Sequence, residues 1–237
     1  MDCKATYLGS NGWYIQLSKT NILIDPWLTG DLVFPPGEWF FKGTLENDIA
    51  IPQEIHLLLL TQGLPDHCHI PSLKHISKEI TVICSKSAHK IINKLGFTDI
   101  KIMEPNDKLK YMDLEIEATP GAPVPTVENG YIVKNNAGSF YIEPHGFFDK
   151  KINSRKLDIV ITPTKNLKLP ILGSFVKGAD VLPDLIKTFK PQFVLSSTVG
   201  GDASYSGILN KLIKIEESEV EPDCKLINLD SMQSLIF

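Results

Sequence analysis

The residues best suited to chemistry in this chain stand close together in the stretch TQGLPDHCH, residues 61–69. This stretch follows the apolar run IHLLLL, residues 55–60, whose length and composition predict a buried strand. A polar loop at the end of such a strand lies at an edge of the sheet, where α/β proteins place their ligands. The adjacent carboxylate and imidazole groups of Asp66 and His67 could bind one divalent cation together. The loop therefore predicts a metal site.

The same loop resembles the THxHxDH motif of the metallo-β-lactamase superfamily, whose histidines and aspartate hold one or two metals that activate a water. Thr61, Asp66 and His67 match this motif, whereas Gln62 and Leu64 stand where its first two histidines belong. We interpret the loop as a degenerate version of the motif, with fewer ligands than a dinuclear centre needs.

The resemblance extends well beyond the loop. Residues 5–30, ATYLGSNGWYIQLSKTNILIDPWLTG, are similar to the first hairpin of the L-ascorbate-6-phosphate lactonase branch, whose members read TYLGHSGFLI and then ILIDPWLTG. Residues 176–197, VKGADVLPDLIKTFKPQFVLSS, resemble the helix and strand that lead to the last metal ligand. This likeness implies an α/β fold of the four-layer αββα type and hydrolysis of a small phosphorylated, ester or lactone metabolite.

The other family ligands can be placed by the same resemblance. Matching FYIEPHG to the family pattern IYHAGDT puts His145 at the bridging aspartate. The third family histidine falls within residues 118–125 and the last falls near Thr198, so both are absent. The remaining set, Asp66, His67 and His145, belongs in the family to the second metal site. The resemblance thus implies one zinc or iron ion held by these three residues, with Asp66 also catalytic.

Several neighbouring side chains could support such a site, namely Asp25, Gln62, His69 and Glu143. A metal-free interpretation is the alternative, in which Asp66 and His67 form a buried hydrogen-bonded pair with Asp25 nearby. The fold would then serve as a small-molecule binding protein or as a subunit of an assembly. Two alternatives stay open for the cofactor, one zinc or iron ion or no metal at all.

The periodicity of apolar residues predicts the elements that position the site. Short alternating runs at residues 114–118 and 140–143 predict strands, and SKSAHKIINKLG, residues 85–96, has the apolar spacing of a helix. The same spacing predicts a second helix over YSGILNKLIKIEE, residues 205–217. No low-complexity linker divides the chain, so we expect one domain over residues 1–237.

Composition limits the partners and the compartment. The net charge of −4 argues against a nucleic-acid partner, because phosphate binding needs a basic face. No apolar run approaches the roughly 20 residues of a transmembrane helix, and the first residues lack the pattern of a signal peptide. The four cysteines form no CxxC pair, which favours a reducing compartment. We therefore expect a cytoplasmic protein without a transmembrane segment.

Two segments suggest what could bind. Residues 26–43 concentrate five tryptophan and phenylalanine side chains, which could form one wall of a pocket or pack against the core or a second subunit of a homo-oligomer. Residues 165–178 combine three lysines with an apolar stretch, a mixture that suits an anionic, partly apolar small molecule. Charged residues that flank an apolar loop also serve simply to keep it soluble.

Overall fold

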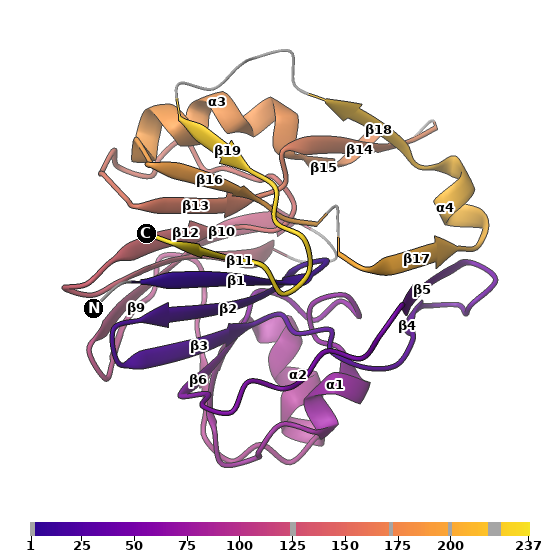
Figure 1. Ribbon diagram of the computed structural model, residues 1–237, viewed down its shortest axis with the longest axis horizontal. Coiled ribbons are helices and arrows are strands. Elements are labelled where there is room, and N and C mark those ends of the chain that lie inside the picture. The colour runs from indigo at the N-terminus through magenta and orange to yellow at the C-terminus, as the bar shows by residue number, and fades with distance from the viewer. Residues whose placement is uncertain (1–2, 124–126, 171–172, 199–200, 218–223) are drawn as a thin grey trace.

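Two seven-stranded sheets form the centre of the computed structural model, which describes residues 3–123, 127–170, 173–198, 201–217 and 224–237 (Figure 1). The first sheet runs in the order β20-β1-β2-β3-β6-β7-β8 and the second in the order β19-β16-β13-β12-β11-β10-β9. The strands of the first sheet are β20 (Ser234–Ile236), β1 (Lys4–Gly9), β2 (Gly12–Leu17), β3 (Thr20–Ile24), β6 (Leu57–Leu60), β7 (Thr81–Cys84) and β8 (Ile100–Ile102). The strands of the second are β19 (Lys225–Ile227), β16 (Phe193–Ser196), β13 (Ile159–Thr162), β12 (Ser139–Ile142), β11 (Val127–Lys134), β10 (Leu114–Pro123) and β9 (Lys108–Tyr111).

The sheets and helices form four layers. One apolar core lies between the two sheets, where it includes Trp13, Ile15 and Phe140. A second core joins the first sheet to α1 (Ile70–Lys74) and α2 (Lys86–Lys94), and a third joins the second sheet to α3 (Gly178–Phe189). The helices thus cover the outer faces, and the predicted four-layer αββα arrangement is confirmed (Figure 1).

The strand that leads to the site is buried on both faces. All four residues of β6 are fully buried, because one face contacts the core between the sheets and the other contacts the core under α1 and α2. Its parallel neighbours β3 and β7 pair with it residue by residue. This environment explains why the run reads as uninterrupted leucine, a pattern typical of parallel strands covered on both sides.

Outside the two main sheets, a smaller unit extends from the molecule, and we call it the arm. It consists of β4 (Leu32–Phe34), β5 (Phe41–Leu45), β17 (Ala203–Ser206) and α4 (Ile208–Leu212) (Figure 1). Another small sheet contains β14 (Lys165–Leu169), β15 (Gly173–Lys177) and β18 (Lys214–Glu217).

The helix predicted over residues 205–217 is therefore wrong over most of its length. Only Ile208–Leu212 is helical, and Gly207 before it has a φ of 97°, a conformation that interrupts a right-handed helix. The flanking residues pair instead with distant strands, β17 with β5 and β18 with β14. Pairing with partners far away in the sequence outweighs a local helical spacing of apolar residues.

Within the described residues, no helix is both long enough and apolar enough to cross a membrane.

Candidate functional site

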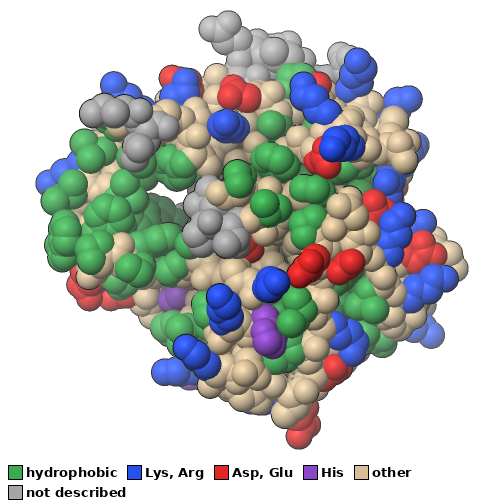
Figure 2. Space-filling view, turned by 180° about the vertical axis from the view of Figure 1, so that it is seen from behind, with side chains coloured by type: hydrophobic (Ala, Val, Ile, Leu, Met, Phe, Trp, Pro, Cys, Tyr) green, Lys and Arg blue, Asp and Glu red, His purple; other side chains and the backbone are tan. Residues whose placement is uncertain are grey.

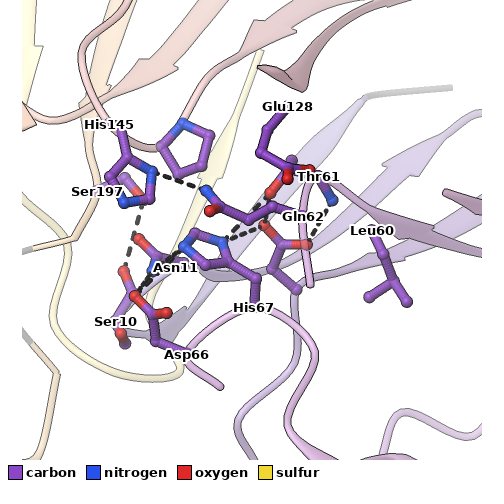
Figure 3. A network of polar contacts seen from close by, with 12 residues as sticks. Ser10, Asn11, Leu60, Thr61, Gln62, Asp66, His67, Glu128, His145 and Ser197 are labelled. Carbon is purple, nitrogen blue, oxygen red and sulfur yellow. Dashed lines mark hydrogen bonds and ion pairs between the residues drawn. The ribbon is translucent and has the colours of Figure 1, made fainter. Parts of the chain in front are cut away.

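Four connections meet at one edge of the two sheets and build the site (Figure 3). They are the β1–β2 turn with Ser10 and Asn11, the loop after β6, the loop after β12, and the end of β16. Hydrogen bonds join them, since the Thr198 amide donates to the Ser10 carbonyl and the Thr198 hydroxyl donates to the Pro144 carbonyl at 2.8 Å. The Asn129 amide of β11 also donates to the Thr61 carbonyl. The ends of strands from both sheets thus hold the site, as expected for this kind of fold.

Asp25 fixes the orientation of His67 at the bottom of the site. Its Oδ2 lies 2.8 Å from Nδ1 of His67 and accepts a 2.5 Å hydrogen bond from the Thr61 hydroxyl. Its Oδ1 accepts the Thr61 amide at 2.9 Å. All three residues are fully buried. Because Nδ1 of His67 is occupied by Asp25, Nε2 is the ring atom that faces the site.

Asp66 lies on the other side of the His67 ring. Its Oδ2 is 3.3 Å from Nε2 of His67, so the imidazole has a carboxylate at each nitrogen. Burial alone would lower the pKa of His67, but the charges of Asp66 and Asp25 outweigh burial and raise it to about 10. Burial would raise the pKa of Asp66, yet the neighbouring His67 charge holds it below its usual value.

Asn11 fills the space beside this pair. Its amide nitrogen lies 3.0 Å from Oδ2 of Asp66 and 3.1 Å from Nε2 of His67. The amide oxygen faces the Thr198 hydroxyl, 2.9 Å away. A carboxylate oxygen at 3.0 Å requires a donor, so the nitrogen of Asn11 faces Asp66. Thr198, which stands where the family has its last histidine, thus holds Asn11 in place.

His145 enters the site from the second sheet. Its ring centroid is 5.2 Å from that of His67, and its Nδ1 is 2.7 Å from Nε2 of Gln62. Burial, with a smaller contribution from the His67 charge, lowers the pKa of His145 to about 4, so the ring is neutral. The Gln62 nitrogen can only donate, so Nδ1 accepts and the ring proton is on Nε2.

Glu143 shapes the loop that carries His145. Its carboxylate accepts the backbone amides of His145 at 3.1 Å, Phe147 at 2.6 Å and Ala122 at 3.3 Å. Burial raises its pKa to about 7, against the effect of these three donors. Glu143 therefore acts on the backbone around His145.

Two acceptor atoms in the site are buried without a hydrogen-bond partner among the described residues. They are Oε1 of Gln62 and Oδ1 of Asp66. Native proteins leave few buried polar atoms unpaired, because each costs roughly 1–3 kcal/mol. Two in one small site indicate a place where another molecule supplies the donors.

The structure brings together most of the side chains expected from the sequence. Asp25, Gln62, Asp66 and His67 form one cluster with His145, and Glu143 supports it. His69 lies apart from this cluster, because its ring caps α1 through Ser72 and Nε2 reaches the Asp31 carbonyl at 3.1 Å.

Sequence reasoning missed Asn11, Thr198 and Tyr205. The hydroxyl of Tyr205, on β17, lies beside the Ser10 side chain and near enough to Asp66 for that charge to contribute to its raised pKa, of which burial is the main cause. Asn11 stands in the turn GSNG of the hairpin that resembles the family's first hairpin. A polar residue in that turn could have indicated Asn11 as part of the site. Tyr205 gave no such indication, because it comes from a segment expected to be helical.

A family model described as a beta-lactamase superfamily domain matches residues 4–197. The chain belongs to this family and has the metallo-β-lactamase fold. Its placement in the lactonase branch stays a prediction.

Individual relatives agree on the fold. The chain is 39% identical over 64 residues to a UPF0173 metal-dependent hydrolase of Paracoccus denitrificans (strain Pd 1222), an alignment covering 27% of this chain and 24% of that protein. The match thus spans about a quarter of the curated relative. The structure of a possible metal-dependent hydrolase from Veillonella parvula DSM 2008 superposes with a TM-score of 0.72 at 13% identity, covering 100% of both chains. An isothiocyanate hydrolase from Delia radicum gut bacteria gives 0.71 at 14% identity, covering 99% of this chain and 98% of that one.

The donors of this site do not fit the metal that the family implies. Ligand distances for zinc are about 2.0–2.2 Å, and the Asn11 amide already lies against Oδ2 of Asp66 and Nε2 of His67. A cation there would meet the amide hydrogens of Asn11. Among the described residues, no group of three or more histidine, cysteine, aspartate or glutamate side chains is arranged to hold a metal ion.

Proposed function

We propose that this chain binds a small neutral or cationic organic molecule at the active-site edge of a metal-dependent hydrolase fold, through its own side chains. The position of the Asn11 amide between Asp66 and His67 carries this proposal. In that position an uncharged amide takes up the space that the family gives to a metal. This proposal takes up the alternative of a metal-free binding protein that the sequence left open.

The polar groups that remain define the head of the ligand. Oε1 of Gln62 and Oδ1 of Asp66 accept hydrogen bonds, and Nε2–H of His145 donates one. Such a set suits a group with N–H or O–H donors, for example an amine, an amide or a hydroxyl. Carboxylates lie at both nitrogens of the His67 ring, so the cluster carries no surplus positive charge to attract an anion.

Because the cluster has no surplus positive charge, we propose a neutral or cationic ligand in place of the anionic one that the lysines of residues 165–178 suggested. Lys165 pairs with Glu217 at 2.8 Å, and Lys168 pairs with Glu216. Both pairs connect β14 to β18 and stabilise that small sheet. We therefore assign these lysines to the surface and place the ligand at the cluster of Gln62, Asp66 and His145.

The experiment compares three small probes of similar size, ethylamine, acetamide and acetate, by calorimetric titration. We expect the amine and the amide to bind and acetate to bind at least tenfold more weakly. Gln62→Leu and Asp66→Asn should each weaken amine binding. The exposed Gln192→Leu and Asp48→Asn serve as matched controls and should bind like the unmodified protein. Preferential binding of acetate, or unchanged binding in both site variants, would overturn the proposal.

Hydrolysis of an ester or lactone at a single zinc or iron ion is the second candidate. Two observations favour it: Nδ1 of each histidine is held by a partner, and Oδ1 of Asp66 is unpaired. Partners of this kind orient metal ligands in known sites. Metal analysis of protein purified without a histidine tag and dialysed against zinc or iron separates the candidates. About one equivalent of bound metal in the unmodified protein, lost in both His67→Ala and His145→Ala, would support the hydrolase. We expect the unmodified protein to hold less than about a tenth of an equivalent.

A further inference from the structure

A row of aromatic rings leads from the candidate site into the arm, and we call it the aromatic wall. Tyr205 stacks on Phe41 with ring centroids 5.7 Å apart and planes inclined by 26°. Phe34 meets Phe41 edge to face at 5.5 Å, and Trp27 lies 6.3 Å from Tyr205. Trp27 is fully buried, so the surface itself is supplied by Phe34, Phe41 and Tyr205, which meet only because β17 pairs with β5.

The wall is attached to the polar cluster through Tyr205. Its hydroxyl lies beside the side chain of Ser10, next to Asn11, and its pKa is raised by burial and, to a smaller extent, by the charge of Asp66. Its ring faces the arm. One residue therefore has its polar end in the candidate site and its apolar body on the wall, so the two surfaces are continuous.

Gly43 shows that this arrangement is closely packed. A Cβ at this position of β5 would lie 2.8 Å from the Trp27 ring and 3.1 Å from the Tyr205 ring. Both rings therefore lie directly against the backbone of β5, and any larger residue would displace them. The wall is a built surface with fixed positions for its rings.

Beyond the wall, the arm exposes large apolar side chains, which we call the apolar rim. Trp39 is 62% exposed, Ile208 is 52% exposed and Leu212 is 46% exposed. The rim is ordered, since the amides of Ile208 and Leu209 donate to the carbonyls of Trp39 and Phe40. Figure 2 shows hydrophobic side chains of the arm gathered around a hollow on this side of the molecule. Exposed apolar patches of this kind mark sites where another apolar group binds.

We propose that the ligand of the candidate site carries an apolar body of several carbon atoms, which lies along the aromatic wall toward the apolar rim. This inference rests on the proposed function, because the polar head of the same ligand is bound by Gln62, Asp66 and His145. The continuity of wall and cluster through Tyr205 selects this occupant over a partner that would bind the rim alone. The ligand is thus amphipathic, with a donor-bearing head and a hydrocarbon chain or ring.

A series of primary alkylamines, from ethylamine to hexylamine, tests the inference by calorimetric titration. If the chain lies on the wall, each added methylene should strengthen binding about two- to fourfold, the upper value corresponding to full burial of a methylene. Trp39→Ser should leave ethylamine binding unchanged and reduce the gain for the longer amines. Ile102→Ser, which alters an exposed apolar residue on β8, is the matched control and should keep the full gain.

The outcomes separate the two proposals. Binding of ethylamine with no gain along the series overturns the apolar body and leaves the proposed function standing. Failure of every amine to bind overturns both. Sedimentation of the free protein and flotation with phosphatidylcholine vesicles are measured in parallel. A dimer or a vesicle complex that is lost in Trp39→Ser assigns the rim to another copy or to a membrane, and it overturns the inference.

Discussion

The two halves of the candidate site use their polar atoms to different extents. Around His67, both ring nitrogens, both oxygens of Asp25 and both ends of the Asn11 amide have partners. Around His145, the Gln62 amide is bonded only through its nitrogen, and its oxygen is buried without a partner in the part of the chain that the structure describes. Asp66 belongs to both halves, with Oδ2 paired and Oδ1 unpaired.

This difference indicates a division of roles. A buried polar network in which every member is satisfied contributes rigidity and a defined structure. A half with unpaired acceptors has lower stability by itself and gains when a ligand supplies the donors. We expect substitutions in the His67 half to act mainly on folding, and substitutions in the His145 half to act mainly on binding. The following changes test that contrast.

The largest effect is expected from Asp25→Ala. Asp25 is fully buried and accepts hydrogen bonds from the Thr61 amide, the Thr61 hydroxyl and His67. Removing one partner of a buried charge pair costs about 3–5 kcal/mol. We expect the free energy of unfolding, measured by urea denaturation, to fall by that amount. A loss below about 1 kcal/mol would contradict the structural role of this half.

The pH dependence of stability should show the charge of His67. Its pKa is about 10 in the folded protein and 6.5 without these neighbours, so this stabilising contribution is complete below about pH 6.5 and is lost as the pH rises through 10. Glu143, with its pKa raised to about 7, changes stability in the same direction at lower pH. We therefore expect the free energy of unfolding to decrease between pH 7 and pH 10.

Asp66→Asn isolates the contribution of His67 to this slope. Asp66 contributes the largest share of the upward shift, so its loss should bring the pKa of His67 down. Urea denaturation at pH 8, 9 and 10 should then show a smaller decrease than in the unmodified protein. Asp48→Asn, on the surface, should keep the original slope. Equal slopes in all three proteins would show that His67 is not an imidazolium.

Gln62→Leu, in the His145 half, should affect ligand binding more than stability, the opposite of Asp25→Ala. The substitution removes one hydrogen bond to His145 but also removes the unpaired buried oxygen, so the two effects partly cancel. We expect the free energy of unfolding to change by less than about 1 kcal/mol, while ethylamine binding weakens about tenfold or more. A large loss of stability with unchanged binding would remove the distinction between the two halves.

The sequence predicted much of the fold because its apolar patterns agree with the final packing. The run expected to be a strand at residues 55–60 is β6, Leu57–Leu60, and the helix expected over residues 85–96 is α2, Lys86–Lys94. β6 buries all four of its leucines, and α2 buries Ala88 and Ile92. The arm was not predictable in this way, because β17 and β18 owe their form to strands far away in the sequence.

The candidate site was predictable only where one loop or a family pattern supplied it. Asp66 and His67 are neighbours in the chain, and His145 came from the resemblance. Asn11 contacts Asp66 across 55 positions of sequence, and Thr198 contacts Asn11 across 187. Neither side chain suggests chemistry by its type alone. Their effect depends on distances between loops, which a single sequence does not contain.

The smallest effect is expected when the two lost histidines of the loop are restored together, Gln62→His with Leu64→His. The family's first metal also uses a histidine that falls within residues 118–125, where this chain has none. The second position stays filled by the Asn11 amide, which Thr198 continues to hold. Two imidazoles without a third ligand bind zinc weakly, because structural and catalytic zinc sites have at least three protein ligands.

The double variant should therefore gain less than about a tenth of an equivalent of zinc after dialysis, measured by elemental analysis beside the unmodified protein. Adding Asn11→Ser to the double variant removes the amide from between Asp66 and His67 and should raise the zinc content toward one equivalent. Comparison of the zinc content of the double variant with that of the triple variant shows whether the lost histidines or Asn11 prevents metal binding. If the double variant alone held two equivalents, Asn11 would not block the metal, and the His67 half would be a metal site like that of the family.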